Sequence, residues 1–266
     1  MTAEYSFHAG NTPLLVSVPH DGRELPADLA AQMNDLGRSL PDTDWHVARL
    51  YEFAADLGAS LLVANYSRYV VDLNRPADDA ALYATRPATG LCPTQTFAGQ
   101  DIYAQATAID VDDRVSRYWR PYHDKVAATL AKLRESFGYA LLWDAHSIAS
   151  RVPALFDGEL PELNVGTWDG RSCSRVITDA VLQVVQASTY SGVLNGRFKG
   201  GYITRHYGQP GASVHAVQLE IAQRAYMDEQ STNYDEAKAS QLRDVLTLLL
   251  QAFMRTARDN AGIIRA

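Results

Sequence analysis

The stretch Leu141-Leu142-Trp143-Asp144-Ala145-His146-Ser147 constrains the fold more than any other part of the chain. It is an apolar run that stops abruptly at an acid, a histidine and a hydroxyl. Buried strands of α/β sheets have this pattern, because they deliver polar groups to the carboxyl edge of the sheet, where ligands bind. A second copy lies near the start of the chain, where the apolar run 14–18 is followed by Pro19-His20-Asp21-Gly22. We therefore expect His20 and His146 at the ends of two buried strands.

The rest of the chain alternates between segments typical of strands and segments typical of helices. Short apolar runs that end in turn residues predict strands, and apolar residues that return every three or four positions predict helices. The predicted strands are 14–18, 59–64, 69–73, 140–143, 163–168, 192–194 and 214–221, and the predicted helices are 42–57, 111–137, 174–185 and 235–258. Pro121 is expected to kink the second helix. The pattern predicts one α/β domain over residues 1–266, with helices on both faces of a mixed central sheet.

Composition narrows the class of protein. With 266 residues, 47% of them hydrophobic, the chain can bury a large core. Its net charge of -7 argues against nucleic acid or an anionic membrane surface as the main partner, because both attract basic surfaces. No apolar run approaches the roughly 20 residues of a membrane-spanning helix, and residues 1–10 lack the features of an export signal. Cys92 and Cys173 have no pair-like spacing, so we expect reduced thiols in a cytoplasmic protein that acts on a small molecule.

Histidines at strand ends, with carboxylates nearby, indicate a catalytic zinc site. Such a site takes three nitrogen or oxygen ligands from the protein and leaves a fourth position for water. His20 and His146 are the first two candidates. The third ligand is expected to be a carboxylate near the end of the first strand, which leaves Asp44, Asp21 and Glu24. Asp144 lies two residues before His146, on the same face of the predicted strand, so it is instead a candidate for orienting an imidazole.

Two groups of cations indicate an anionic ligand, because arginine binds carboxylates through two parallel hydrogen bonds. The first group flanks the predicted strand 69–73 and consists of Arg68, Asn74 and Arg75. The second lies in and after a glycine-rich loop, where the backbone can approach a ligand closely, and consists of Arg197, Lys199 and Arg205. The alternative for both groups is a solvated surface loop.

Glu220 is an acid on the otherwise apolar predicted strand 214–221. A carboxylate is costly to bury without a partner or a role, and near a metal it is the usual general base of amide hydrolysis. The alternative is a glutamate that faces solvent at a strand end. The segment 77–101, rich in Pro, Thr, Ala and Gly, is predicted to be a long loop; loops of this length tend to be functional, and its length permits closure over the site.

Six short motifs occur in a fixed order along residues 11–255. They are Val18-Pro19-His20-Asp21-Gly22, Asp42-Thr43-Asp44, Tyr66-Ser67-Arg68 with Val71-Asp72-Leu73-Asn74-Arg75, Trp143-Asp144-Ala145-His146-Ser147, Asn195-Gly196-Arg197-Phe198-Lys199-Gly200-Gly201 and Gln218-Leu219-Glu220. Together they resemble the N-formylglutamate deformylases (amidohydrolases) of histidine degradation, a family distantly similar to zinc carboxypeptidases and aspartoacylases. The resemblance implies a phosphorylase/hydrolase-like fold with three α/β/α layers.

The resemblance also implies roles for individual residues. Zinc would be held by two histidines and one carboxylate, Glu220 would be the general base, and the substrate would be bound by Arg68, Asn74 and Arg75. The carboxypeptidase pattern has a glutamate three residues after the first histidine, where this chain has Arg23. We therefore assign the third metal ligand to Asp44, ahead of Glu24 and Asp21.

The reaction that the resemblance implies is the metal-dependent hydrolysis of N-formyl-L-glutamate to formate and L-glutamate. Arg75 or Arg68 would stabilise the oxyanion, and the two cationic groups would each bind one carboxylate of the substrate. Two alternatives stay open. One is a hydrolase of another N-acyl or N-carbamoyl amino acid, and the other is a non-catalytic relative that binds a ligand but no metal.

Overall fold

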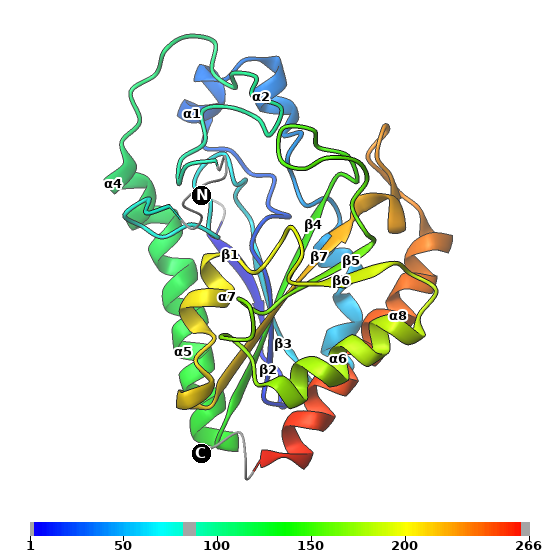
Figure 1. The fold of residues 1–266 in the computed structure, drawn as a ribbon. Coiled ribbons are helices and arrows are strands. Elements are labelled where there is room, and N and C mark those ends of the chain that lie inside the picture. Colours follow the sequence, from blue (N-terminus) through cyan, green and yellow to red (C-terminus); the bar gives the residue numbers. More distant parts are fainter. Residues whose placement is uncertain (1–2, 82–88, 262–266) are drawn as a thin grey trace.

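A seven-stranded mixed sheet forms the centre of the computed structural model, which describes residues 3–81 and 89–261 (Figure 1). The strands, in their order across the sheet, are β1 (Tyr5–His8), β3 (Ser60–Ala64), β2 (Leu14–Val18), β4 (Ala140–Ile148), β7 (Val214–Ala222), β5 (Leu163–Gly166) and β6 (Gly192–Leu194). The four strands from β3 to β7 are parallel, whereas β1 and β5 run antiparallel to β3 and β7. A separate small sheet pairs β8 (Met227–Asp228) with β9 (Asn233–Tyr234).

Helices cover both faces of the sheet, which confirms the predicted three-layer α/β/α fold. Figure 1 shows α5 (Arg120–Phe137) and α7 (Tyr202–Tyr207) on one face, and α6 (Arg175–Ala187) and α8 (Glu236–Asp259) on the other. The shorter helices are α1 (Ala27–Gln32), α2 (Asp35–Ser39), α3 (Val47–Leu50) and α4 (Val111–Arg114), with the 3-10 turns η1 (Glu52–Ala55), η3 (Pro210–Ala212) and η4 (Gln223–Ala225). None of the helices in the described ranges is long and apolar enough to span a membrane.

The two central strands, β4 and β7, are each buried over all nine residues, and alternate residues point to opposite faces. We call the face toward α6 and α8 the core face. Its residues belong to one apolar cluster with those helices, and they are Leu141, Trp143, Ala145, Val217, Leu219 and Ile221. The core face of β4 and β7 is therefore apolar except at His215, near the start of β7, and at Ser147, which lies beside Ile221 at the carboxyl end.

The face toward α5 and α7, which we call the site face, changes in character along the strands. It begins with apolar residues that pack with α5, namely Ala140, Leu142, Val214 and Ala216. It continues with polar residues that the strand register places side by side, Asp144 beside Gln218 and His146 beside Glu220. The parallel strands thus carry four polar side chains to one end of one face.

Two of the predicted elements are wrong or incomplete. Residues 68–70 form a turn rather than the start of a strand 69–73, and the backbone N–H of Val70 donates to the carbonyl of Ser67 at 2.9 Å. The predicted helix 42–57 is reduced to α3 and η1, because residues 42–46 turn toward the carboxyl edge of the sheet, where the N–H of Asp44 donates to the carbonyl of His20 at 3.1 Å.

The predicted helix 111–137 is confirmed with an irregularity at the expected place. Between α4 and α5 the chain forms a π-helical segment, η2 (Val115–Trp119), and Pro121 lies in the first turn of α5. Proline has no N–H to donate and its ring crowds the preceding turn, so a wider turn just before it is favourable. Within the long loop predicted at 77–101, residues 82–88 lie outside the described part of the chain, and the described residues of that loop carry neither a helix nor a named strand.

Candidate active site

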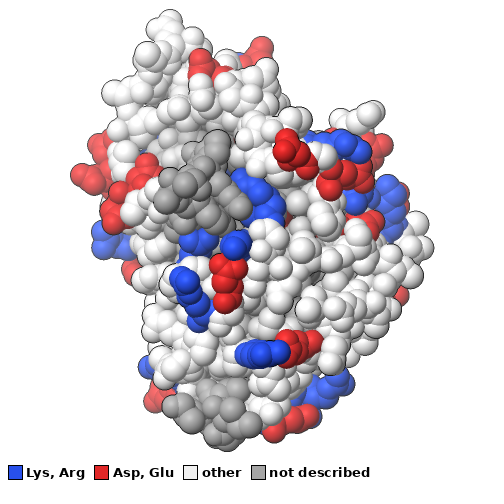
Figure 2. Space-filling model, viewed as in Figure 1, with Lys and Arg blue, Asp and Glu red and all other residues white. Residues whose placement is uncertain are grey.

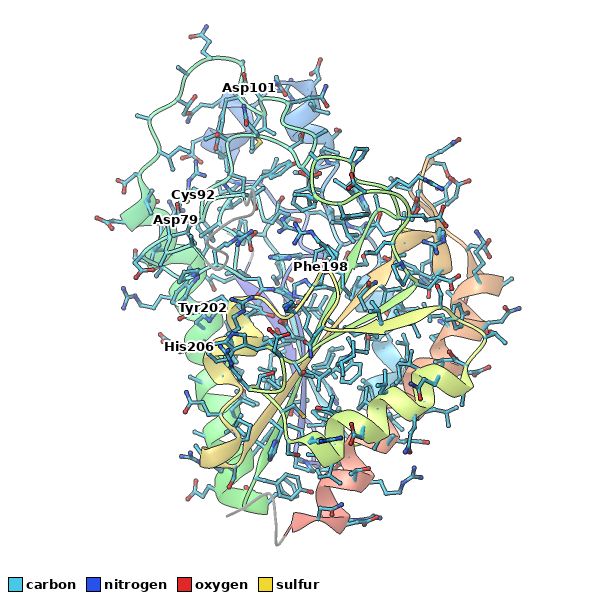
Figure 3. All side chains as sticks on the ribbon, viewed as in Figure 1. Asp79, Cys92, Asp101, Phe198, Tyr202 and His206 are labelled. Atoms are coloured by element: carbon cyan, nitrogen blue, oxygen red, sulfur yellow. The ribbon has the colours of Figure 1, made fainter. Side chains whose placement is uncertain are left out.

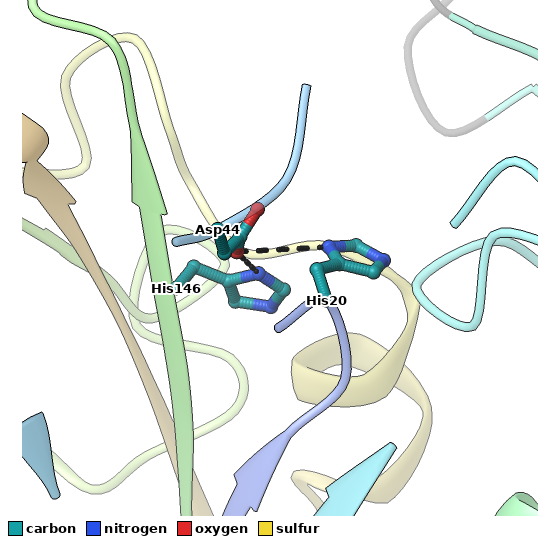
Figure 4. A group of neighbouring side chains, drawn as sticks. All are labelled: His20, Asp44 and His146. Carbon is teal, nitrogen blue, oxygen red and sulfur yellow. Dashed lines mark hydrogen bonds and ion pairs between the residues drawn. The ribbon is translucent and has the colours of Figure 1, made fainter. Parts of the chain in front are cut away.

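Three buried side chains converge at the carboxyl end of β2 and β4 (Figure 4). His20 follows β2, His146 lies in β4, and Asp44 comes from the loop before α3. One potential ligand atom from each lies within 4.8 Å of the others. Asp44 Oδ2 is 2.9 Å from His146 Nδ1 and 3.8 Å from His20 Nδ1. The structure thus brings together the three residues that the sequence suggested as metal ligands.

The second ring nitrogen of each histidine faces a different carboxylate. Nε2 of His20 lies 2.8 Å from Oδ1 of Asp72, and Nε2 of His146 lies 3.2 Å from Oδ1 of Asp144. In a neutral imidazole, a carboxylate at Nε2 favours the proton on that nitrogen and leaves the lone pair on Nδ1. Both Nδ1 atoms face Asp44, so the two imidazoles and this carboxylate could bind the same metal ion.

The alternatives for the third ligand lie elsewhere. The carboxylate of Asp21 accepts the backbone N–H groups of His46 and Ala48, each at 3.0 Å, so it caps the start of α3. Glu24 is exposed, and its backbone forms an isolated bridge with Tyr66. Among the three carboxylates considered from the sequence, only Asp44 is placed beside both histidines.

Arg68 is buried and forms ion pairs with two carboxylates that also face the histidines, those of Asp44 and Asp72. Its Nη2 donates to Oδ2 of Asp72 at 2.7 Å, and its Nη1 lies 3.4 Å from Oδ1 of Asp44. Burial opposes the charge, but these two carboxylates raise the pKa of Arg68 and keep it cationic. Its guanidinium also lies 4.7 Å from the centre of the Phe97 ring. The guanidinium of Arg68 is therefore paired with carboxylates of the protein, whereas from the sequence we expected it to bind a carboxylate of the substrate.

The two histidines differ in their affinity for protons. Burial and the charge of Arg68 lower the pKa of His20, despite the opposing effect of Asp72 and Asp44. Burial also acts to lower the pKa of His146, but Asp144 and Asp44 outweigh it and raise that pKa well above its usual value. Without a metal, His20 is thus neutral near pH 7 and His146 is cationic, so a metal that bound both histidines would displace a proton from His146.

Glu220 lies beside His146 in the strand register and is buried to 7% exposure. Burial, with a contribution from the charges of Asp44 and Asp144, raises its pKa to about 8, although His146 and Arg68 act in the opposite direction. Its Oε2 accepts a hydrogen bond from Gln218 Nε2 at 3.2 Å. A carboxyl group with such a pKa exchanges a proton readily near neutral pH.

One cavity of about 100 Å³ joins these groups. The residues that line it include most of those expected from the sequence, namely His20, Asp44, Arg68, Asn74, Arg75, His146, Arg197 and Glu220. Lys199 and Arg205 do not line it. Nζ of Lys199 pairs with Asp169 at 3.0 Å, and Nε of Arg205 donates to the carbonyl of Gly200 at 2.7 Å. Figure 2 shows that Lys and Arg side chains gather near the centre of one face, with most of the acidic side chains toward its edge.

The amide of Asn74 is held on both sides. Its Nδ2 lies 3.0 Å from Nε2 of His146, and its Oδ1 accepts the backbone N–H of Ile203, in the first turn of α7, at 2.8 Å. The side chain fills the space next to Gly201, where a Cβ would clash with the amide of Asn74. Asn74 therefore links the glycine-rich loop and α7 to a histidine of the cluster.

Sequence reasoning assigned no role to several residues of the cavity. Asp72 carried a signal, because it is an acid directly before the Asn74-Arg75 pair. The apolar residues of the cavity carried none, and they are Phe97, Ile148, Leu155 and Phe198. Figure 3 shows Phe198 over the carboxyl edge of the sheet, whereas Tyr202 and His206 lie along α7.

Comparisons with known proteins agree with this architecture. A family model described as N-formylglutamate amidohydrolase matches residues 12–227. An N-formylglutamate deformylase of Pseudomonas putida is 51% identical over 254 residues, which cover 94% of this chain and 95% of the relative. A protein of the same name from Pseudomonas aeruginosa is 51% identical over 259 residues, covering 96% and 97%.

Two solved structures have the same fold. The crystal structure of an N-formylglutamate amidohydrolase from Ralstonia eutropha JMP134 has a TM-score of 0.83 and 25% identity, and the match covers 97% of this chain and 100% of that one. A gene product of Agrobacterium tumefaciens has a TM-score of 0.71 and 19% identity, with 94% and 96% covered. The second match supports the fold alone.

Proposed function

The chain belongs to the N-formylglutamate amidohydrolase family, and from this premise we propose that it hydrolyses N-formyl-L-glutamate to formate and L-glutamate with the help of a divalent metal, zinc. The observation that carries the proposal is the convergence of His20, Asp44 and His146 at one end of a cavity that also holds Glu220. In this role the enzyme would act in the cytoplasm and complete a route of histidine degradation.

The donor set fits zinc. Two imidazole nitrogens and one carboxylate oxygen are a common ligand set for a catalytic zinc with one open position. The charge of the site supports a cation as well. Three buried aspartates, Asp44, Asp72 and Asp144, lie beside the histidines, and the guanidinium of Arg68 pairs with the first two. The carboxyl group of Glu220 is buried next to them. A zinc ion bound there would act as a Lewis acid toward the formyl oxygen and lower the pKa of a water molecule.

Glu220 is proposed as the residue that moves the proton. It takes a proton from the attacking water, whose oxygen bonds to the formyl carbon, and delivers it to the nitrogen as the carbon–nitrogen bond breaks. The pKa of about 8 suits the second half of this task, and a cation nearby would lower it and so suit the first. The hydrogen bond from Gln218 holds the carboxyl group in the cavity.

The substrate has two carboxylates, and the cavity is lined by two arginines besides Arg68. Arg197 is anchored by a hydrogen bond of 2.7 Å from its Nε to the carbonyl of Leu155. We assign one carboxylate to Arg197, and we assign Arg75 to the other carboxylate or to the oxyanion that develops on the formyl group. Arg68 is proposed to support the metal ligands through its ion pairs, and Lys199 and Arg205 no longer have a proposed role.

Formate release by the purified protein tests the proposal. We expect release from N-formyl-L-glutamate at a kcat/KM at least tenfold above that for N-acetyl- or N-carbamoyl-L-glutamate. N-formyl-L-glutamine, which lacks the side-chain charge, serves as the matched control for the arginine assignment and should show a raised KM. Release from none of the formyl compounds, with zinc or any other divalent metal supplied, would disprove the proposed reaction.

A further inference from the structure

Phe97 lies where three cavities meet. It lines the cavity of the candidate active site, a second cavity of about 350 Å³ and a third of about 300 Å³. The active-site cavity and the second cavity share two residues, Phe97 and Ile148. These two side chains therefore form the boundary between the small space beside the histidines and a larger space next to it.

The boundary lies close to the proposed metal ligands. Ile148 is two residues after His146 on β4, so both belong to the site face. The strand register continues from the pair His146 and Glu220 to the pair Ile148 and Ala222, and an apolar row thus follows directly on the reactive one. Phe97 packs against the apolar cluster that contains this row.

The ring of Phe97 is fixed in place. Its backbone N–H donates to Oδ2 of Asp42 at 2.7 Å, two residues before Asp44, and the guanidinium of Arg68 covers the ring. The turn that carries it is closed by a hydrogen bond of 2.9 Å from the N–H of Gly99 to the carbonyl of Thr96. The backbone of Phe97 is thus bonded to the loop that carries Asp44, and its ring contacts Arg68, which pairs with Asp44.

We propose that Phe97, together with Ile148, sets the size of the acyl group that the site accepts. The inference rests on the proposed function, since the acyl carbon must lie beside His20, Asp44 and His146 to react. A substituent on that carbon is one bond from the reacting centre, so it meets the nearest wall of the cavity first. With Phe97 in place the wall admits the hydrogen of a formyl group and excludes a methyl group, and the second cavity lies behind the wall.

The variant Phe97→Ala tests the inference, with Phe198→Ala as the matched control. Both variants remove the same side chain from the active-site cavity, but Phe198 lines neither the second nor the third cavity. For Phe97→Ala we expect the ratio of kcat/KM for N-acetyl- to N-formyl-L-glutamate to rise about 10- to 100-fold, the usual range for one methyl-sized group in an apolar pocket. For Phe198→Ala the ratio should stay within about threefold. The variant Phe97→Leu, which keeps part of the apolar contact, should be intermediate.

Three results would overturn the inference. The first is an unchanged ratio in a Phe97→Ala protein that is folded by circular dichroism. The second is an equal rise in Phe198→Ala. The third is a relaxed preference for the amino acid instead, seen when N-formyl-L-aspartate and N-formyl-L-2-aminoadipate are compared with N-formyl-L-glutamate.

A binding measurement separates this inference from the proposed function. To exclude heat from turnover, N-acetyl-L-glutamate is titrated calorimetrically into two zinc-loaded proteins that both carry Glu220→Gln, one with Phe97 and one with Phe97→Ala. Binding at least tenfold tighter to Phe97→Ala supports the acyl boundary even if the wild-type protein releases no formate, which would disprove the reaction alone. Equal binding to both proteins would refute the boundary, whatever the activity.

Discussion

The core face and the site face of β4 and β7 consist of alternate residues of the same two strands, yet they differ where the strands reach the carboxyl edge. At that level the core face carries the apolar residues Ala145, Leu219 and Ile221 and one hydroxyl, that of Ser147. The site face carries four polar residues, Asp144, His146, Gln218 and Glu220. At the carboxyl end of these two strands, the acidic and imidazole side chains therefore all lie on one face. Substitutions on the two faces should therefore separate stability from activity.

The polar side chains of the site face can be buried because each forms a hydrogen bond. The partner lies either outside the two strands or next to the residue on a strand. Oδ2 of Asp144 accepts a hydrogen bond from Thr204 in α7 at 2.9 Å, and Oε1 of Gln218 accepts the N–H of Gly201 at 2.7 Å. Such bonds offset the free-energy cost of removing polar groups from water. The site face therefore depends on the glycine-rich loop and α7, whereas the core face depends on apolar packing.

The largest separation is expected for Glu220→Gln on the site face. The amide keeps the shape of the side chain but cannot accept the proton, so kcat should fall by about 10² to 10⁴-fold. The free energy of unfolding should change by less than about 1 kcal/mol, because a carboxyl group whose burial already raises its pKa is replaced by a neutral group. Steady-state kinetics and urea unfolding of the same preparation measure both. Retained turnover would remove Glu220 from the role of base.

Trp143→Ala on the core face should show the opposite pattern. Trp143 is fully buried, donates from Nε1 to the hydroxyl of Tyr51 at 2.9 Å and packs 5.6 Å from the ring of Phe253. Its removal should lower the free energy of unfolding by about 3–5 kcal/mol. Activity per folded molecule should stay within about threefold at a temperature where the variant is folded. A selective loss of kcat in a variant of unchanged stability would refute the division between the faces.

Asp144→Asn tests whether a fully buried residue of the site face contributes to zinc affinity. The amide preserves the bond to Thr204 but weakens the hold on Nε2 of His146, so zinc affinity should fall about 10- to 100-fold. Competition with a chromophoric chelator measures the affinity. The control is Thr204→Val, which removes the other bond of Asp144 and should affect zinc affinity less. Equal zinc affinity in Asp144→Asn and wild-type protein would show that this carboxylate does not orient the histidine.

Strand periodicity explains what the sequence could predict. The apolar runs before His20 and His146 identified two parallel strands, and the position of Glu220 on a third run indicated a place near the same edge. The structure brings these residues together, and metal binding by them stays a prediction. Asp44 was chosen ahead of Glu24 and Asp21 and was expected at the start of a helix. The loop that carries it has a left-handed backbone at His46, with φ 63°, which no periodicity indicates.

Tertiary contacts explain what the sequence could not predict. Residues 69–73 are buried but form a turn and a loop instead of the predicted strand, and Arg68 pairs with Asp72 across this turn. The inward direction of Arg197 and the outward direction of Lys199, two residues apart in a loop, depend on anchors at Leu155 and Asp169. Such contacts between distant segments leave no regular spacing in the sequence.

Zinc titration of the chelated protein, followed by formate release, tests the central claim most directly. The account predicts no turnover in metal-free protein, recovery in proportion to added zinc, and saturation at one ion per chain. The variant Asp44→Asn should recover little activity at the same zinc concentration, while its far-ultraviolet circular dichroism matches that of the wild-type protein. Full activity in the metal-free protein, or zinc uptake and turnover unchanged in Asp44→Asn, would contradict a metal site at the polar end of the site face.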